Sequence, residues 1–464
     1  MSAPGPRFPC DAVPDDPGDA RLLGLYEQRQ DGLLLERVRV PGGRLTGAQL
    51  RGLAAVAVRF TPGYPLHLTM RQDVELHGLR AQDVPAAQRM LAEIGMTTVG
   101  TCGDTLRNVT VCPGGGLCPG SMDPYPLAQA IRTAAEALPW IYRMPRKFKI
   151  SLSGCANACA RPWINDVGLV GSSGGTFAAI LAGSLGSRPA PGIPTHDGLA
   201  AQQAVSLVLA VLTLFNEEGD RRNRARARLR HVRERLGDDL FKRRVQEYVA
   251  RAPSRTAPVA SASGRARRFR VRLAFPLGDI QPEEADALAE AVERSDCLMR
   301  IGPEHDLFLF AEREPELPAE LTQIVDGPRV VACPGSTWCK RGLVDTRRTA
   351  RLILKSLTYG ADASVHLSGC PNDCAQASVA EIGLVGRITS AQGEREECFR
   401  LLAGGGQGRG PGLARELHPA LPVDRVAKTV TDLTGQYLKS GGGREWAEFV
   451  SAREAELGRD VSGV

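Results

Sequence analysis

The chain has 464 residues, of which 43% are hydrophobic, and its 58 lysines and arginines outnumber its 52 aspartates and glutamates to give a net charge of +6. This composition suits a globular protein of roughly two or three domains, and no run reaches the roughly 18 apolar residues of a membrane-spanning helix. The opening MSAPGPRFPC has no apolar signal core, so we expect a cytoplasmic protein that does not enter a membrane.

Alternating and amphipathic patterns predict strands and helices in turn along the chain. Strands are expected at 34–40, 148–152, 269–273 and 364–367, and helices at 128–138, 204–215 and 346–357. This mixture predicts an α/β or α+β fold. Residues 251–268 are rich in Pro, Ser, Ala and Arg without an apolar period, which predicts a linker. We therefore expect a first half at 1–250 and a second half at 269–464.

The two halves repeat one cysteine pattern. The first-half thiols are Cys112, Cys118, Cys155 and Cys159, and the second-half thiols are Cys333, Cys339, Cys370 and Cys374. Both sets read C-x5-C, a gap of about thirty residues, then C-x3-C, and the tetrapeptide GLVG follows at 168–171 and 383–386. Chance does not produce four cysteines twice at matching intervals, so the chain contains an internal repeat.

Twelve cysteines in a chain expected in the cytoplasm indicate metal ligation or redox chemistry rather than disulfides. A cubane iron–sulfur cluster takes four thiolates, and glycine-rich loops let the backbone fold around it. Structural zinc usually takes C-x2-4-C pairs, so the C-x5-C spacing fits zinc poorly. Cys10, Cys297 and Cys398 stand alone and are expected to be buried apolar side chains.

Several motifs make the chain resemble the siroheme-dependent sulfite and nitrite reductases nearly from end to end. They are the second-half thiols with GCPN at 369–372, LTMRQ at 68–72, TCGDTLRN at 101–108 and PRKFK at 145–149, in the family's order. The resemblance implies two pseudo-twofold related halves of the nitrite/sulfite reductase fold. It also implies a siroheme beside a [4Fe-4S] cluster held by the second-half thiols, with Cys374 as the axial ligand of the siroheme iron.

The same resemblance assigns anion binding to Arg71, Arg107, Lys147 and Lys149. Arginine can fork onto oxyanion oxygens, and two lysines separated by one residue of a strand face the same side. In this family the second position of Lys-x-Lys tends to be asparagine in nitrite reductases, so Lys149 favours sulfite.

The predicted function is the six-electron reduction of sulfite to sulfide. Because no flavin or nicotinamide motif is visible, ferredoxin or a similar small protein is expected as the electron donor. Nitrite reduction to ammonia at the same site, a role like that of precorrin-3B synthase, and a non-catalytic iron–sulfur or tetrapyrrole protein stay open as alternatives.

The first-half thiols depart from the assimilatory members of this family and resemble the dissimilatory sulfite reductases, so a second [4Fe-4S] cluster is a further expectation. The positions that align opposite the four anion-binding residues are Glu304, Pro328, Asp362 and Ser364. Two acids without a cation would repel sulfite, which predicts one productive site and one degenerate mate.

A basic run at 221–235 has no interleaved aromatic residues, so nucleic acid is not an expected partner. A siroheme carries several carboxylates, which a basic run near the cofactor would attract.

Overall fold

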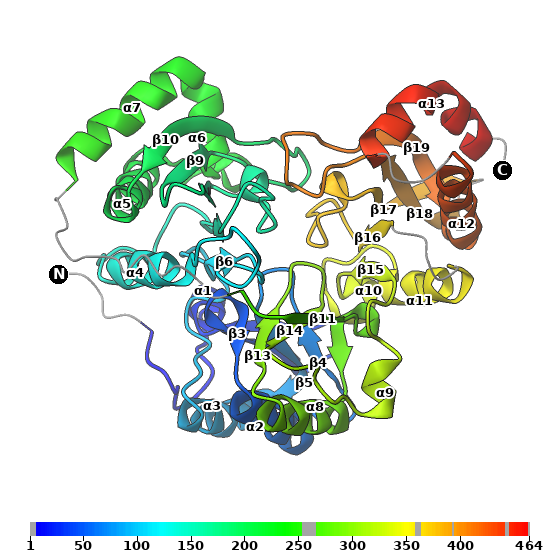
Figure 1. Cartoon of the computed structure of the whole chain (residues 1–464), viewed down its shortest axis with the longest axis horizontal. Coiled ribbons are helices and arrows are strands. Elements are labelled where there is room, and N and C mark those ends of the chain that lie inside the picture. The colour runs from blue at the N-terminus through cyan, green and yellow to red at the C-terminus, as the bar shows by residue number, and fades with distance from the viewer. Residues whose placement is uncertain (1–5, 253–265, 358–362, 392–393, 441–444, 463–464) are drawn as a thin grey trace.

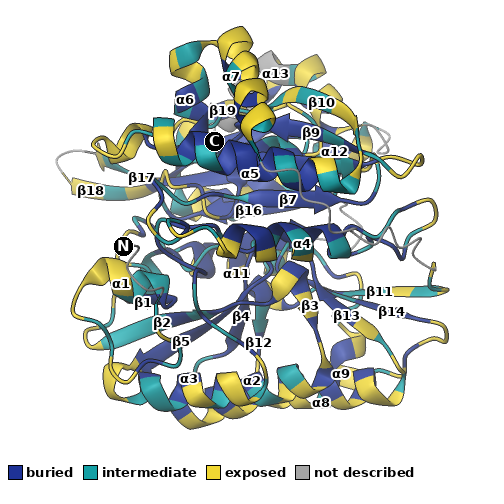
Figure 2. Ribbon diagram, turned by 90° about the vertical axis from the view of Figure 1, so that its left-hand side faces the viewer, coloured by how far each residue is buried: buried dark blue, intermediate teal, exposed yellow. Residues whose placement is uncertain are grey.

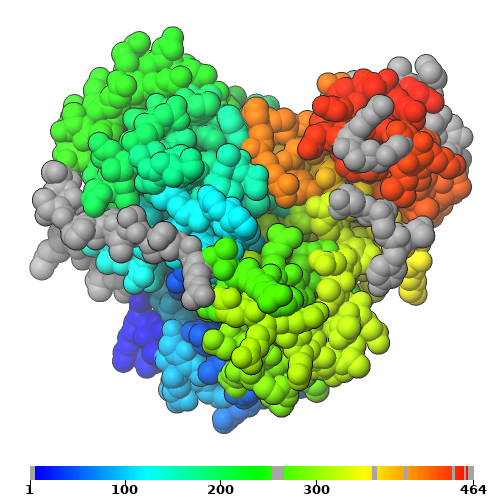
Figure 3. Space-filling model, viewed as in Figure 1, coloured from blue at the N-terminus to red at the C-terminus, as the bar shows by residue number. Residues whose placement is uncertain are grey.

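A computed structural model describes residues 6–252, 266–357, 363–391, 394–440 and 445–462. The chain forms a base and two upper lobes, one from each half of the sequence (Figure 1). The space-filling view has a notch between the two upper lobes (Figure 3). None of the described helices is both long and apolar enough to cross a membrane.

The base contains two sheets that exchange short strands. The first has the order β1-β2-β5-β4-β12, and the second has the order β11-β14-β13-β3. Their strands are β1 (Leu25–Glu27), β2 (Leu33–Val38), β3 (Arg44–Leu45), β4 (Leu66–Leu68), β5 (Val74–Arg80), β11 (Phe269–Leu273), β12 (Asp279–Ile280), β13 (Leu298–Ile301) and β14 (Leu307–Ala311). Because β3 pairs with β13 and β12 pairs with β4, each half supplies one strand to the sheet of the other.

Helices cover the outer face of these sheets, along the bottom of Figure 2. They are α2 (Gly47–Phe60), α3 (Val84–Glu93) and α8 (Pro282–Arg294), with the short α1 (Pro17–Leu22) and α9 (Ala319–Thr322) nearby. Thr46 and Gln49 close a capping box at the start of α2, which satisfies backbone N–H groups that have no partner within the helix. The apolar faces of α2 and α8 lie in one core with both sheets of the base.

The two upper lobes repeat one topology. The first-half lobe contains β6 (Thr110–Val111), β7 (Ile150–Ser153), β8 (Val167–Gly171), β9 (Phe177–Leu181), β10 (Ile193–Leu199), α4 (Tyr125–Glu136), α5 (Ala201–Glu218), α6 (Leu229–Leu236) and α7 (Asp238–Arg251). The second-half lobe contains β15 (Arg329–Ala332), β16 (Ser364–Ser368), β17 (Ile382–Ala391), β18 (Glu394–Ala403), β19 (Arg415–Pro422), α10 (Gly335–Trp338), α11 (Thr346–Ser356), α12 (Val423–Lys439) and α13 (Trp446–Ser462). In each sheet three parallel strands are followed by two antiparallel ones.

The mixed fold and the two related halves are therefore confirmed. The predicted helix at 204–215 is the central part of the largely buried α5. Arg251 ends α7 and β11 begins at Phe269, while residues 253–265 of the predicted linker lie outside the described residues. The two halves are not separate units, because each supplies a strand to the sheet of the other. The sequence did not predict this exchange.

Candidate active site

The second-half thiols lie on loops that follow parallel strands. Cys333 follows β15, and Cys370 follows β16, its neighbour in the sheet. The backbone N–H of Gly369 donates to Cys333 Sγ at 3.1 Å. Burial raises the pKa of the Cys333 thiol to about 12 and that of Cys370 to about 11, and the neighbouring Cys374 contributes in both cases. Four crowded thiols of this kind become thiolates when a metal binds them.

The donor set fits an iron–sulfur cluster. All twelve cysteines are free thiols. Within the described ranges, no group of three or more His, Cys, Asp or Glu side chains is arranged to hold a single metal ion. A cubane is larger than one ion because each of its four irons takes its own thiolate, so thiols spaced more widely suit it better than they suit zinc. Cys374 is the exposed member of the set, as a ligand shared with a second group would need to be.

The two predicted lysines face this cysteine from the other half. Lys147 and Lys149 flank Phe148, just before β7. Phe148 is fully buried and its ring lies 5.6 Å from that of Phe215, so the lysines project from the opposite face. Both lysines lie within electrostatic reach of Cys374. The expectation that they share one side is confirmed, and that side is the one that faces the second-half thiols.

Positive charge accumulates at this position. Burial, together with the positive charges of Arg228 and Arg107, lowers the pKa of Lys147 from 10.5 to about 8. Burial and the charge of Lys147 place the pKa of Lys149 well below its ordinary value. Among the described residues, neither ammonium has an ion-pair or hydrogen-bond partner. Two partly buried cations without counter-ions attract anions.

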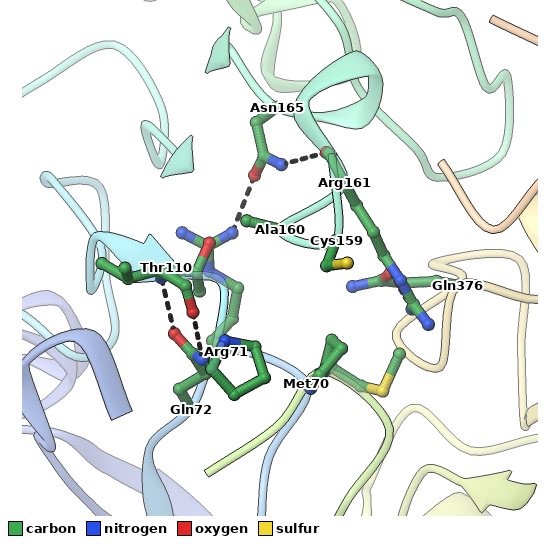
Figure 4. A pocket seen from close by; sticks show the side chains of 12 residues that line it. Met70, Arg71, Gln72, Thr110, Cys159, Ala160, Arg161, Asn165 and Gln376 are labelled. Atoms are coloured by element: carbon green, nitrogen blue, oxygen red, sulfur yellow. Dashed lines mark hydrogen bonds between the residues drawn. The ribbon is translucent and has the colours of Figure 1, made fainter. Parts of the chain in front are cut away.

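The two predicted arginines are held in place by the protein. Arg71, on the turn between β4 and β5, donates from Nη1 to Asn165 Oδ1 at 2.7 Å (Figure 4). Its Nη2 donates to the carbonyl of Ile150 at 3.1 Å, and its buried Nε has no hydrogen-bond partner among the described residues. Arg107 donates from Nη2 and Nε to the carbonyl of Gly103, at 2.9 and 3.2 Å. All four predicted cations therefore lie in one region, and the two lysines carry its uncompensated charge.

Two residues that position the lysines were not predicted. Asp166 accepts the backbone N–H of Lys149 at 2.8 Å and pairs with Arg228, also at 2.8 Å. Arg228 belongs to the basic run at 221–235. The sequence alone did not show which arginine of this run reaches the site. Arg224 and Arg233 form ion pairs in which at least half of one partner's side chain is exposed, whereas the Asp166 side chain is fully buried.

Glu304, at one of the positions opposite the four cations, has cationic neighbours of its own. It pairs with Arg161 at 2.8 Å, and Arg329 and Arg409 contribute to the lowered pKa of its carboxyl. These cations come from segments that the repeat alignment does not place there, and the degenerate second site stays a prediction. Ser364 accepts a hydrogen bond from Gln407 at 2.7 Å, Pro328 precedes β15, and Asp362 lies outside the described residues.

The lone cysteines follow their prediction in part. Cys10 and Cys398 are buried, while Cys297 is half-buried.

Comparison with protein families gives two matches. Residues 102–252 and 327–447, more than half of the chain, match the family described as nitrite and sulphite reductase 4Fe-4S domain. Residues 26–94 match the nitrite/sulfite reductase ferredoxin-like half domain. The repeated match covers both upper lobes, in agreement with their shared topology.

Individual relatives carry two kinds of name. The chain is 28% identical to the assimilatory ferredoxin-dependent nitrite reductase of Haloferax mediterranei, over 94% of this chain and 87% of that protein. It is 27% identical to sulfite reductase [ferredoxin] 1 of Mycolicibacterium paratuberculosis, over 95% and 89%. The solved structure of the Mycobacterium tuberculosis NirA protein has the same fold, with a TM-score of 0.81 and 23% identity over 95% of this chain and 90% of that one.

Proposed function

The chain belongs to the nitrite and sulphite reductase family, and we propose that within this family it reduces sulfite to sulfide. It is an oxidoreductase whose cofactors are a siroheme and a [4Fe-4S] cluster. When bound, these groups supply electrons one at a time and an open iron face for the substrate. The second-half thiols would hold the cluster, and Cys374 would also ligate the siroheme iron.

One observation carries the choice of sulfite: the unpartnered ammonium groups of Lys147 and Lys149 opposite Cys374. Near neutral pH sulfite is a mixture of the singly and doubly charged anions, whereas nitrite carries one negative charge. Because Coulomb energy scales with the product of charges, two adjacent cations favour the dianion more strongly. The family tendency for asparagine at the second position in nitrite reductases points the same way.

The arginines and the lysines have different roles because their side chains differ in chemistry. Arg71 and Arg107, whose guanidinium groups donate to Asn165 and to backbone carbonyls, contribute fixed positive charge around the anion. Lys147 and Lys149 bind its oxygens and deliver protons, because each oxygen that leaves as water takes up two protons. Lys147, with a pKa of about 8, exchanges protons readily near neutral pH. Asp166 acts as a positioning residue through its hydrogen bond to the Lys149 backbone.

We propose ferredoxin as the electron donor, in keeping with the names of the relatives. Twelve free thiols suit a reducing compartment, so we place the enzyme in the cytoplasm.

Nitrite reduction is the second candidate, because the Haloferax relative and the ferredoxin–nitrite reductase of Synechococcus elongatus, which is 29% identical, are named for it. The test is a comparison of kcat/KM for sulfite and nitrite, with siroheme-loaded enzyme and reduced methyl viologen as donor. We expect the larger value for sulfite. A larger value for nitrite would reassign the substrate, and turnover of neither anion would favour the non-catalytic alternative.

A further inference from the structure

The first-half thiols lie on the same loops as the second-half thiols. The backbone N–H of Gly154 donates to Cys112 Sγ at 3.2 Å, which matches the 3.1 Å contact between Gly369 and Cys333. A Cβ added to Gly154 would lie 2.3 Å from the carbonyl oxygen of Met122, so this close approach requires glycine. The backbone that surrounds the cluster thiols in the second half is thus present in the first.

The C-x3-C turns agree in equal detail. Ser153 Oγ accepts the N–H of Ala160 at 3.1 Å, and Ser368 Oγ accepts the N–H of Ala375 at the same distance. Burial raises the pKa of the Cys112 thiol to about 12, and the other first-half thiols lie within electrostatic reach of it or of one another. Two loops that agree in these contacts present their sulfurs for the same kind of ligand.

A buried ion pair lies close to Cys159. Cys159 lines a small pocket together with Arg71, Arg161 and Gln376 (Figure 4). Arg161 also forms an ion pair with Glu304, and the two side chains are only 4% and 8% exposed. A tetrapyrrole that displaced either side chain would leave a buried charge unpaired, which is unfavourable. A buried ion pair thus lies beside Cys159, whereas Lys147 and Lys149 near Cys374 have no ion-pair partner among the described residues.

One buried hydrogen bond joins the two C-x3-C turns. Arg161 follows Cys159 by two residues, and Gln376 follows Cys374 by two residues. Both adopt a left-handed backbone, with φ of 58° and 61°. Arg161 Nη1 donates to Gln376 Oε1 at 2.6 Å, with both residues buried. This contact brings the loop that ends in Cys159 against the loop that ends in the siroheme ligand.

We propose that the first-half thiols hold a second [4Fe-4S] cluster that has no tetrapyrrole of its own and relays electrons to the second-half cluster across this contact. A one-electron carrier of the ferredoxin type reduces the first-half cluster, which is reoxidised as the second-half cluster is reduced. No bond forms or breaks in this step. The relay role rests on the proposed reductase function, whereas the presence of the cluster does not.

The composition of the purified holoprotein tests the cluster without reference to substrate. We expect about eight acid-labile sulfides per chain, at four per cubane, together with one siroheme. Four sulfides, or two sirohemes, would overturn the proposal. Cys155→Ser should lower the sulfide content to about four and keep the siroheme, while the matched control Cys297→Ser should keep both. If Cys155→Ser does not fold, the wild-type count still decides.

The relay role is tested by comparing two donors. A protein donor must pass its electrons through its docking site, whereas methyl viologen is small enough to reach either cluster. In Cys155→Ser we expect the ratio of ferredoxin-driven to viologen-driven turnover to fall about tenfold. An unchanged ratio in a protein that has lost four sulfides would show that the cluster is structural and overturn the relay.

Discussion

At the scale of single residues, the alternation of lysine and phenylalanine at 147–149 places two positive charges on one side of the chain. Phe148 is anchored in the core of the first-half lobe, which forces Lys147 and Lys149 to the other side of the chain. Asp166 fixes the backbone at Lys149 but directs its charge to Arg228, so it leaves the ammonium uncompensated. Among the described residues no carboxylate pairs with either lysine, so both amino groups are available to a bound anion.

Replacing Lys149 with asparagine should move the preference from sulfite toward nitrite. At roughly 8 Å and an effective dielectric constant of about 20, a unit charge contributes about 2 kcal/mol for each unit of substrate charge. Solvent screening reduces this, and we expect the ratio of kcat/KM for sulfite to that for nitrite to fall about tenfold, which corresponds to about 1.4 kcal/mol. Lys242→Asn, on the exposed face of α7, removes the same charge elsewhere and should leave the ratio unchanged. An unchanged ratio in Lys149→Asn would contradict the assignment.

Activity should fall in alkaline solution as Lys147 loses its proton. Burial lowers the pKa of this lysine to about 8, so the charged form dominates below that pH and the neutral form above it. The carboxylates of a bound siroheme shift the pKa upward, which places the alkaline limb of kcat/KM at pH 8 or above. Arginine stays protonated throughout this range, so Lys147→Arg should abolish the limb. A limb of the same midpoint in Lys147→Arg would assign it to another group.

Substituting Cys374 should uncouple the siroheme from its cluster. We expect Cys374→Ser to lose the electronic interaction between the two centres, seen by electron paramagnetic resonance, together with sulfide production. Cys398→Ser, a buried cysteine on β18 outside both thiol sets, is the matched control and should retain both. Sulfide production by purified Cys374→Ser would mean that another residue is the axial ligand.

The residues of the site divide into those that the sequence could predict and those that it could not. The thiols recur at matching intervals in the two halves, and the four cations lie in short motifs that resemble those of the family. Asp166 and Arg228, or Arg161 and Glu304, are pairs between distant segments, and the sequence does not show which acidic residue pairs with which basic one. These pairs decide which of the two pockets is positive, and only the fold brings them together.

At the scale of elements, the exchanged strands connect the base to the second-half thiols. Asp279 on β12 accepts a hydrogen bond from Arg347 on α11 and lies 2.9 Å from Nδ1 of His67 on β4. The guanidinium of Arg347 lies 4.0 Å from the ring centre of Trp338, which precedes Cys339. A strand of two residues thus supports the cluster loop. Sequence patterns identified β2, β7, β11 and β16, but β3 and β12 are too short for any apolar alternation to identify them.

Asp279→Ala should destabilise the protein strongly. The Arg347 side chain is 2% exposed, so the substitution leaves a buried charge without its counter-ion. Removing one partner of a buried pair costs about 3–5 kcal/mol, which should be visible as a lower midpoint of urea unfolding. Glu293→Ala breaks the Arg51–Glu293 pair, whose side chains are 48% and 44% exposed, and should lower the midpoint much less. Equal losses in the two variants would argue against the role of β12.

At the scale of the whole molecule, each half braces the cysteine loop of the other. Arg29 of the first half donates to the carbonyl of Gly342 at 2.7 Å, within the second-half loop. Arg300 of the second half donates to the carbonyls of Pro113 and Gly115, both at 2.7 Å, within the first-half loop. The repeat predicted two similar halves but not these contacts between them. A repeated motif does not specify whether its contacts lie within one half or between the two halves.

The two halves should therefore fold together even when the chain between them is absent. Residues 1–252 and 266–464 produced as separate chains in one cell should purify as a complex through a tag on either, because β3, β12 and the Arg161–Glu304 pair hold them together. Each half produced alone leaves the apolar faces of α2 or α8 and an unpaired sheet edge exposed, so we expect it to aggregate. Size-exclusion chromatography and siroheme content measure both outcomes. A soluble, folded first half alone would show that the exchanged strands are dispensable and that each half is a domain in its own right.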